Sequence, residues 1–188
     1  MMRCFAISAL FGVALAAPAA DLVTQVPGFN VTSFKVYSGY LSVPGPFQKT
    51  DSHDALSIHY QLHMSQNDPS KDPLVTWHQG GPGGSSINVG LYTEMGYFQL
   101  SDQGSYVNEN AWNAVANMLY LESPAGSGSS SGFSTCLKRG KVVDCEWDDV
   151  SQAEAYAHTL AAFQKAFPEL ASNDLYLTGE SYFGQYVY

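Results

Sequence analysis

The sequence predicts an α/β fold built around one mixed sheet, and three observations support this prediction. Two early segments, Phe34–Val43 and Leu56–Met64, mix apolar and polar residues with a period near two, as β-strands do. Later apolar strands alternate with helical segments, a pattern that favours parallel pairing with right-handed crossovers. The clearest helix, from about Asp148 to Phe167, carries apolar residues at a spacing close to 3.6.

The other elements are predicted from local composition. The polar stretch Pro44–Asp54 indicates a hairpin connection between the first two strands. Asp148 and Asp149 favour the start of the long helix through the helix dipole, and Pro168 marks its end. The remaining expected elements are a strand at Pro73–His78, a short helix from Ser85 to about Glu94, a buried strand at Val115–Leu121, a Gly/Ser-rich loop at Ala125–Ser134 and a last strand at Asp174–Thr178.

Size and composition suit one folded domain. With 188 residues, 45% of them hydrophobic and 13% aromatic, the chain can form a sizeable core. The formal net charge of -9 argues against nucleic-acid binding, which requires Lys and Arg to neutralise phosphates. We expect no cofactor.

Residues 1–19 are typical of a signal peptide, which would leave 20–188 as the folded domain. Arg3 supplies the positive start, Phe5–Leu15 is apolar, and small residues follow at the two candidate cleavage sites, Ala14–Ala16 and Ala17–Ala19. The apolar run is too short for a stable membrane helix, and the alternative is an uncleaved amphipathic start. We therefore expect a secretory-pathway protein, extracellular or in a vacuole- or lysosome-like compartment, with no membrane attachment after cleavage.

The cysteines and a glycosylation sequon agree with export. Cys4 would leave with the signal peptide, so that Cys136 and Cys145 remain around a short basic segment. They suit a disulfide in an oxidising compartment, with two free thiols as the alternative. A metal site is not expected, because no histidine lies close in sequence to either thiol. Asn30-Val31-Thr32 is a sequon for N-glycosylation.

A strand that leads directly into Gly179-Glu180-Ser181 predicts a catalytic serine. A serine hydroxyl is a poor nucleophile unless a base removes its proton. A sharp turn between a strand and a helix exposes that oxygen and directs backbone N–H groups at the developing oxyanion. With the opening antiparallel hairpin, this strand–Ser–helix turn indicates an α/β-hydrolase fold, incomplete because the last strand is also the last complete element.

A glycine-rich run, Gly80–Gly84, follows the third expected strand. An α/β-hydrolase needs such a loop at that place for its oxyanion hole, because glycines let the backbone approach a ligand closely. The alternatives are an ordinary turn and a phosphate-binding loop. No Gly-Lys-Ser/Thr follows the glycines, which argues against the phosphate loop.

Four segments in order resemble the serine carboxypeptidase family of the α/β-hydrolase superfamily. Trp77–Ser86 (Trp-His-Gln-Gly-Gly-Pro-Gly-Gly-Ser-Ser) is similar to the family signature Trp-x-Asn-Gly-Gly-Pro-Gly-Cys-Ser-Ser. Gly179–Val187 resembles the nucleophile signature, and Asn108–Asn113 and Met118–Gly126 match further family blocks. The resemblance runs from about Phe34 to Tyr188 and covers the amino-terminal portion of such an enzyme.

The resemblance implies a chemical role at three matched positions. Ser181 would attack the carbonyl of the last peptide bond of a substrate. The backbone N–H groups of Gly81 and Tyr182 would hold the oxyanion. The implied partners are therefore the C-termini of peptides or proteins.

The resemblance also implies a site for the terminal carboxylate of the substrate. Gln79, the N–H of Gly80 and Glu180 would recognise it, and Glu94 lies near a glutamate that the family also uses. A glutamate binds another carboxylate well only when the two share a proton. Peptide binding is therefore expected to weaken as the pH rises.

Three positions depart from the family pattern. Gln79 stands where the family has Asn, which adds a methylene, and Gly84 replaces a Cys. Phe183 lies two residues after Ser181, where a small residue normally lets helix and strand pack closely. Its side chain could point outward, or the turn could be looser.

The Asp and His that would complete a catalytic triad do not follow Ser181 in this sequence. In this fold the order along the chain is Ser, Asp, His, but neither an Asp nor a His follows Ser181. The five histidines, all before the nucleophile, are His53, His59, His63, His78 and His158. We do not expect His78, the nearest to a functional segment, to act as the base. The last strand should be central in a larger sheet and would present an exposed edge.

Three functions are compatible with these residues. The leading interpretation is a serine-type carboxypeptidase, represented by a fragment that lacks the triad Asp and His. A same-family acyltransferase passes the acyl group to an alcohol instead of water, and nothing in this half separates the two. The third is a truncated, non-catalytic binding remnant, which the three departures favour. The sequence leaves the preferred C-terminal residue and the oligomeric state open.

Overall fold

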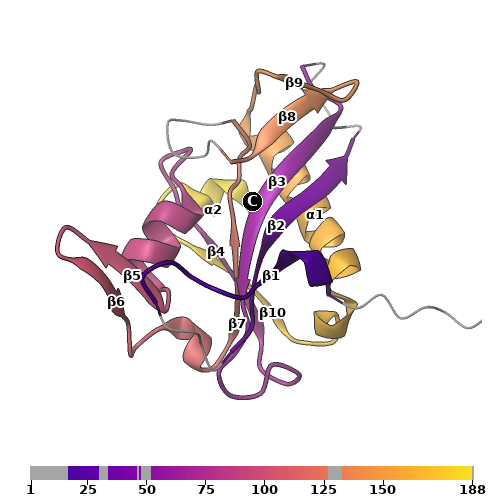
Figure 1. Ribbon diagram of the computed structural model, residues 1–188. Helices are drawn as coiled ribbons and strands as arrows, with labels where there is room; N and C mark the ends of the chain where they lie inside the picture. Colours follow the sequence, from indigo (N-terminus) through magenta and orange to yellow (C-terminus); the bar gives the residue numbers. More distant parts are fainter. Residues whose placement is uncertain (1–16, 30–33, 46, 48–51, 127–132, 188) are drawn as a thin grey trace, which may run out of the picture.

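The computed structural model describes residues 17–29, 34–45, 47, 52–126 and 133–187 (Figure 1). Within them, an eight-stranded mixed sheet has the order β1-β2-β3-β7-β4-β10, with β8 and β9 attached beside β3, and β5 and β6 form a small separate sheet. The strands are β1 (Leu22–Val23), β2 (Val36–Pro44), β3 (Ala55–His63), β4 (Leu74–His78), β5 (Phe98–Ser101), β6 (Gly104–Val107), β7 (Asn117–Leu121), β8 (Thr135–Lys138), β9 (Lys141–Val143) and β10 (Leu175–Gly179). The helices are η1 (Ala19–Asp21), η2 (Ser86–Met95), η3 (Trp112–Ala114), α1 (Asp149–Ala166), η4 (Pro168–Leu170) and α2 (Phe183–Tyr186).

The first half of the sheet is antiparallel, as predicted. β2 and β3 pair over their full length, from Val36 opposite His63 to Pro44 opposite Ala55. Along β3 every second residue from Leu56 to Leu62 is buried, which is the period of two that the sequence showed. Residues 46 and 48–51 of the expected connection lie outside the described residues.

The second half of the sheet is parallel and carries the site. β4 pairs in parallel with β7 on one side and with β10 on the other. All residues of β4 and β7 are buried, as expected of parallel strands covered on both faces. β10 ends the strand order, and its first three residues, Leu175–Leu177, are exposed.

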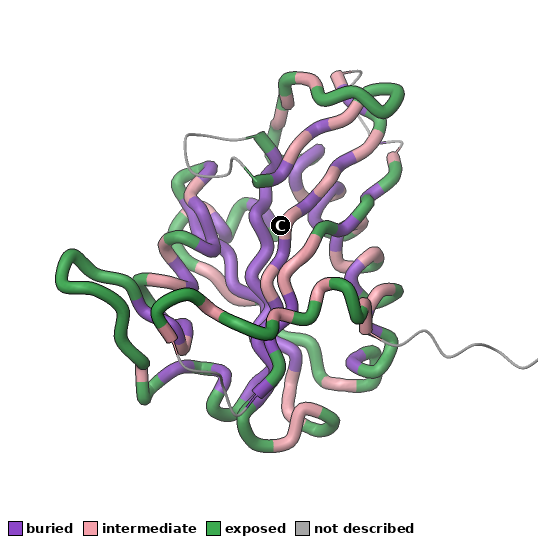
Figure 2. The backbone as a smooth tube through the Cα atoms, viewed as in Figure 1, coloured by how far each residue is buried: buried purple, intermediate pink, exposed green. Residues whose placement is uncertain are grey.

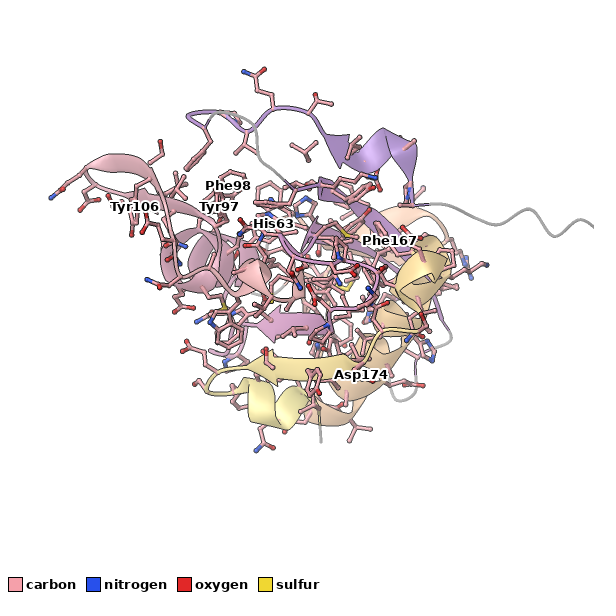
Figure 3. The ribbon with its side chains drawn as sticks, turned by 90° about the horizontal axis from the view of Figure 1, so that it is seen from below. His63, Tyr97, Phe98, Tyr106, Phe167 and Asp174 are labelled. Atoms are coloured by element: carbon pink, nitrogen blue, oxygen red, sulfur yellow. A yellow bond between two sulfur atoms is a disulfide. The ribbon has the colours of Figure 1, made fainter. Side chains whose placement is uncertain are left out.

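The helices η2 and α1 cover opposite faces of the parallel strands (Figure 1). On β7, Leu119 and Leu121 belong to the cluster that includes α1, whereas Met118 and Tyr120 belong to the cluster that includes η2. The buried residues follow the central strands between these layers (Figure 2). A smaller aromatic cluster lies beside η2, where Phe98 contacts Tyr97 and His63 (Figure 3).

Several details differ from the expectations. Val115 is 67% exposed and precedes β7, because its N–H closes the 3-10 turn on Trp112 instead of joining the sheet. The expected short helix is a π-helix, with the Gly96 N–H donating to the Leu91 carbonyl. The short strands β1, β5, β6, β8 and β9 were not predicted.

The long helix begins and ends close to the expected residues. Asp148 is its N-cap and forms a capping box with Ser151, while Phe167 is the C-cap before Pro168. In the part of the chain that the structure describes, no helix has the length and apolar character to cross a membrane. Residues 1–16, Asn30 and most of the Gly/Ser-rich loop (127–132) lie outside it, so the signal peptide and the glycosylation site stay predictions.

Candidate active site

Ser181 occupies a strained turn between β10 and α2. Its φ is +56°, in the left-handed region that residues with a side chain rarely adopt, and the residue is exposed. Three backbone hydrogen bonds hold the turn: Glu180 N–H to the His78 carbonyl (3.1 Å), Phe183 N–H to the Glu180 carbonyl (3.0 Å) and Gly184 N–H to the Ser181 carbonyl (3.3 Å). The backbone strain therefore coincides with the residue that the sequence predicted as nucleophile.

The glycine-rich loop lies directly against this turn. Gly179 is paired with His78 across the parallel strands, so the segments that follow β10 and β4 leave the sheet at the same level. A Cβ on Gly80 would lie 2.7 Å from the Ser181 Cβ and 2.7 Å from the Tyr182 nitrogen. Position 80 can thus accept only glycine without moving the loop or the turn.

Two N–H groups remain available beside Ser181. Gly81, with φ +115°, and Tyr182 lie on either side of this close contact. In the ranges that the structure describes, neither N–H donates a hydrogen bond to a protein acceptor. Uncommitted donors next to a serine are what an oxyanion hole requires.

Side chains from distant parts of the chain support the loop. Tyr186 accepts a hydrogen bond from the Gly83 N–H (3.0 Å). Buried Glu122 accepts one from the Ser85 hydroxyl and another from the Ile87 N–H (3.2 Å). Burial raises the pKa of Glu122. Sequence reasoning missed these supporting roles; both residues lie in matched family segments, and that was the available signal.

Gln79, Glu94 and Glu180 converge beside the turn. The Gln79 Nε2 donates to Glu180 Oε1, and Glu94 lies close enough for both residues to affect its pKa. The Trp77 indole N–H donates to Gln79 Oε1 (3.3 Å), which orients the amide so that its nitrogen faces the two carboxylates. Burial, and then the charge of Glu180, raise the pKa of Glu94. We call these three residues the carboxylate cluster.

The side chain of Gln79 packs against position 84, where glycine carries no side chain. A Cβ on Gly84 would lie 2.8 Å from the Gln79 Cγ and 3.3 Å from its Cβ. Two of the three departures from the family pattern are therefore in contact. A side chain at position 84 would therefore collide with the Cβ and Cγ of residue 79.

Phe183 points inward. It is 5% exposed and stacks on the His78 ring, with the ring centroids 5.2 Å apart and an interplanar angle of 14°. The ring also packs against Gly179, where a Cβ would collide with it. The outward orientation considered from the sequence is therefore wrong, and glycine at 179 provides the space.

No base for Ser181 is present among the described residues. Within them, no imidazole hydrogen-bonds to Ser181, and burial lowers the pKa of His78 to about 3, so its ring binds a proton too weakly to act as a general base. The described ranges also contain no group of three or more His, Cys, Asp or Glu that could hold a metal ion. Cys136 and Cys145 are joined by a disulfide of 2.06 Å, away from Ser181 along the chain.

The contact between positions 79 and 84 yields the first prediction. Gly84→Ala should displace Gln79 and lower the melting temperature of the secreted protein, because the new Cβ overlaps the Gln79 side chain. We expect a cost of about 1–3 kcal/mol, typical of overpacking. Gln79→Ala removes the Cγ that the new Cβ overlaps, so Gly84→Ala should cost much less in that background, and thermal unfolding of the two single variants and the double variant measures the coupling. Additive effects of the two substitutions would contradict the contact.

Comparisons with known proteins place this geometry in a family. The family model described as serine carboxypeptidase matches residues 27–188. The chain is 43% identical over 180 residues to serine carboxypeptidase ctsa-4.1 of Caenorhabditis elegans and 41% identical over 175 residues to the lysosomal protective protein of Mus musculus. These matches cover 94% and 92% of this chain but 34% and 33% of the relatives, so the chain spans about a third of their length.

A solved structure of a carboxypeptidase has a similar fold. The crystal structure of Kex1(delta)p, a prohormone-processing carboxypeptidase from Saccharomyces cerevisiae, superposes with a TM-score of 0.61 at 29% identity, covering 82% of this chain and 32% of that one. The fold is therefore the amino-terminal portion of an α/β-hydrolase sheet. The chain belongs to the serine carboxypeptidase family.

Proposed function

We propose that this chain carries the nucleophile and the substrate-binding loops of a serine carboxypeptidase that releases C-terminal residues from peptides. One observation carries the proposal: the exposed, strained Ser181 lies beside the uncommitted N–H groups of Gly81 and Tyr182. A serine with two such donors can attack a carbonyl and stabilise the resulting oxyanion. The adjacent carboxylate cluster would bind the free end of the substrate.

The reaction follows from these positions. The Ser181 hydroxyl oxygen bonds to the carbonyl carbon of the last peptide bond, and the carbonyl oxygen becomes an oxyanion held by the two N–H groups. The intermediate then expels the amine of the C-terminal residue and leaves an acyl-enzyme, which water hydrolyses. A base must take the Ser181 proton and return it to the leaving amine. We infer that this base lies in a part of the enzyme other than this chain, because relatives are about three times as long.

The carboxylate cluster explains why the substrate would need a free C-terminus. Two glutamates and a substrate carboxylate repel one another unless protons are shared among them. Because the pKa of Glu94 is raised, this carboxyl keeps a proton to a higher pH than an ordinary glutamate and can share it. This fits a lysosome-like compartment of the secretory pathway, which the predicted signal peptide and the name of the mouse relative also support.

Active-site labelling tests the nucleophile. We expect a fluorophosphonate to label the full secreted enzyme that contains this chain, with the added mass on the peptide that includes Ser181. Ser181→Ala should abolish labelling, whereas Ser70→Ala, at an exposed serine away from the site, should not change it. Absence of labelling in the wild-type enzyme would instead support the non-catalytic binding remnant.

Substrate affinity should depend on pH in a defined direction. Binding of a free carboxylate needs a proton on the Glu94–Glu180 pair, so KM should be lowest below the raised pKa of Glu94 and should rise with pH above it. Loss of one required proton corresponds to a rise of about tenfold in KM per pH unit. The measurement compares benzyloxycarbonyl-Phe-Leu with its C-terminal amide between about pH 4 and 8.

The amide and one variant are the controls for this pH effect. The amide carries no charge at its end, so its KM should stay level across the same range. Glu94→Gln should flatten the profile of the free peptide, because the glutamine amide can donate at every pH. A KM for the free peptide that does not change between acidic and alkaline solution would rule out the shared proton.

A further inference from the structure

The hairpin of β8 and β9 concentrates positive charge on an acidic protein. Three of the eight Lys and Arg residues, Lys138, Arg139 and Lys141, lie at its tip, although the formal net charge is -9. Lys138-Arg139 is also the one pair of adjacent basic residues in the sequence. None of the residues described around Ser181 belongs to this hairpin, so its charge has no role in that site.

The tip of the hairpin is accessible from solution. It lies at the top of the view in Figure 1, and residues 138–142 are all exposed. A Cβ added to Gly140 would meet no atom within 4 Å. Among the described residues, neither Arg139 nor Lys141 forms an ion pair. Both of these basic side chains are therefore open to a partner.

The turn itself does not favour an arginine. Lys138 pairs with Lys141, so that Arg139 and Gly140 form a two-residue turn with φ values of +50° and +75°. Such a turn needs positive φ at both positions and is best formed by Asn-Gly or Gly-Gly. Arginine adopts this left-handed backbone only with strain, because it has a Cβ. The geometry of the turn therefore does not account for Arg139, and the strain favours opening of the turn.

Only the outer strand has to move for the turn to open. β8 is held by β3, with Cys136 opposite Leu56, whereas among the described strands β9 pairs with β8 alone. β9 contains no buried residue. The Arg139 N–H ties the tip to the carboxylate of Asp54 (3.0 Å), which is itself exposed. Exposed hydrogen bonds and few buried contacts are typical of segments that open locally.

A disulfide joins the chain on the two sides of the turn. Cys136 on β8 is buried and is bonded to Cys145, which follows β9. A Cβ on Gly126 would lie 2.5 Å from the Cys145 Sγ, so the bridge packs against the segment that follows β7. A break in the backbone between these two cysteines would release no segment, because both new ends stay attached to the bridge.

We propose that the hairpin tip is a processing site, cut between Arg139 and Gly140 by an endoprotease that recognises the Lys-Arg pair. Water adds across this peptide bond and leaves a carboxylate on Arg139 and an amine on Gly140. A protease for basic pairs needs an acidic cleft that takes an extended chain, and the exposed charges of the opened tip complement such a cleft. Exposed loop tips are also the preferred sites of proteolytic cuts. Cleavage depends on the secretory-pathway location proposed above, but not on peptidase activity at Ser181.

The product would be two chains that share one site. The glycine run Gly80–Gly84 stays on the first chain and Ser181 on the second, but β4 and β10 still pair in parallel. The disulfide and this pairing hold the two chains together, so the cut protein should keep its fold.

The test treats the full secreted enzyme, as its Ser181→Ala variant, with a purified endoprotease specific for Lys-Arg pairs. The variant is used so that the enzyme cannot trim its own new C-terminus at Arg139. Before reduction, peptide mapping by mass spectrometry should find the disulfide-linked hairpin with the mass of one added water. After reduction, the two chains should separate and the second should begin at Gly140.

Two further substitutions locate the cut. Arg139→Gln keeps the backbone N–H that donates to Asp54, so the hairpin should still form, but cleavage should slow at least about a hundredfold, because a pocket built for a guanidinium loses its charged partner. Lys71→Gln removes an exposed basic residue outside the hairpin and should leave the rate unchanged. A folded enzyme that stays whole at Arg139, or an equally fast cut in Arg139→Gln, would overturn the inference. Either result would leave the proposed role of Ser181 standing.

Discussion

The contact of Gly80 with the turn at Ser181 is the constraint on which the site depends. Neighbouring strands lie about 4.8 Å apart, and the paired ends of β4 and β10 bring the two following loops to that separation. With 2.7 Å left for a Cβ, a side chain at position 80 would push the loops apart. The amide of Gln79 and the N–H of Gly81, on either side of Gly80, would move with the loop. One backbone contact thus sets the positions of the proposed nucleophile, of the proposed oxyanion donors and of the carboxylate cluster.

The sequence could predict those elements whose signal is local. β3 buries alternate residues, so its period of two could be recognised in the sequence. The helix α1 has a capping residue at its start, apolar residues at a spacing near 3.6 and a proline after its end. Ser181 and the glycine run were identified because strained turns and close backbone contacts restrict which residues can occupy them. In each of these features, a few neighbouring residues are enough to indicate the local structure.

Other features depend on contacts that no local pattern reports. All residues of β6 are exposed, so no alternation marks it as a strand. Because η2 is a π-helix, its apolar residues do not recur at the 3.6-residue spacing by which an α-helix is recognised. The support of Ser85 by Glu122 and of Gly83 by Tyr186 joins residues far apart in the sequence. Glu122 and Tyr186 lie in segments that resemble the family, but their supporting roles came only from the fold.

The departures from the family pattern bear on whether this site is maintained. Under relaxed constraint, substitutions would accumulate independently and leave voids or overlaps between neighbours. Here Gln79 packs against position 84 without overlap, and the bulky Phe183 packs between Gly179 and His78. The Phe183 ring fits because position 179 carries no Cβ, so the larger residue fills space without forcing the turn apart. Phe183 lies two residues after Ser181, and this close packing beside it favours a site that has been kept intact over a decaying remnant.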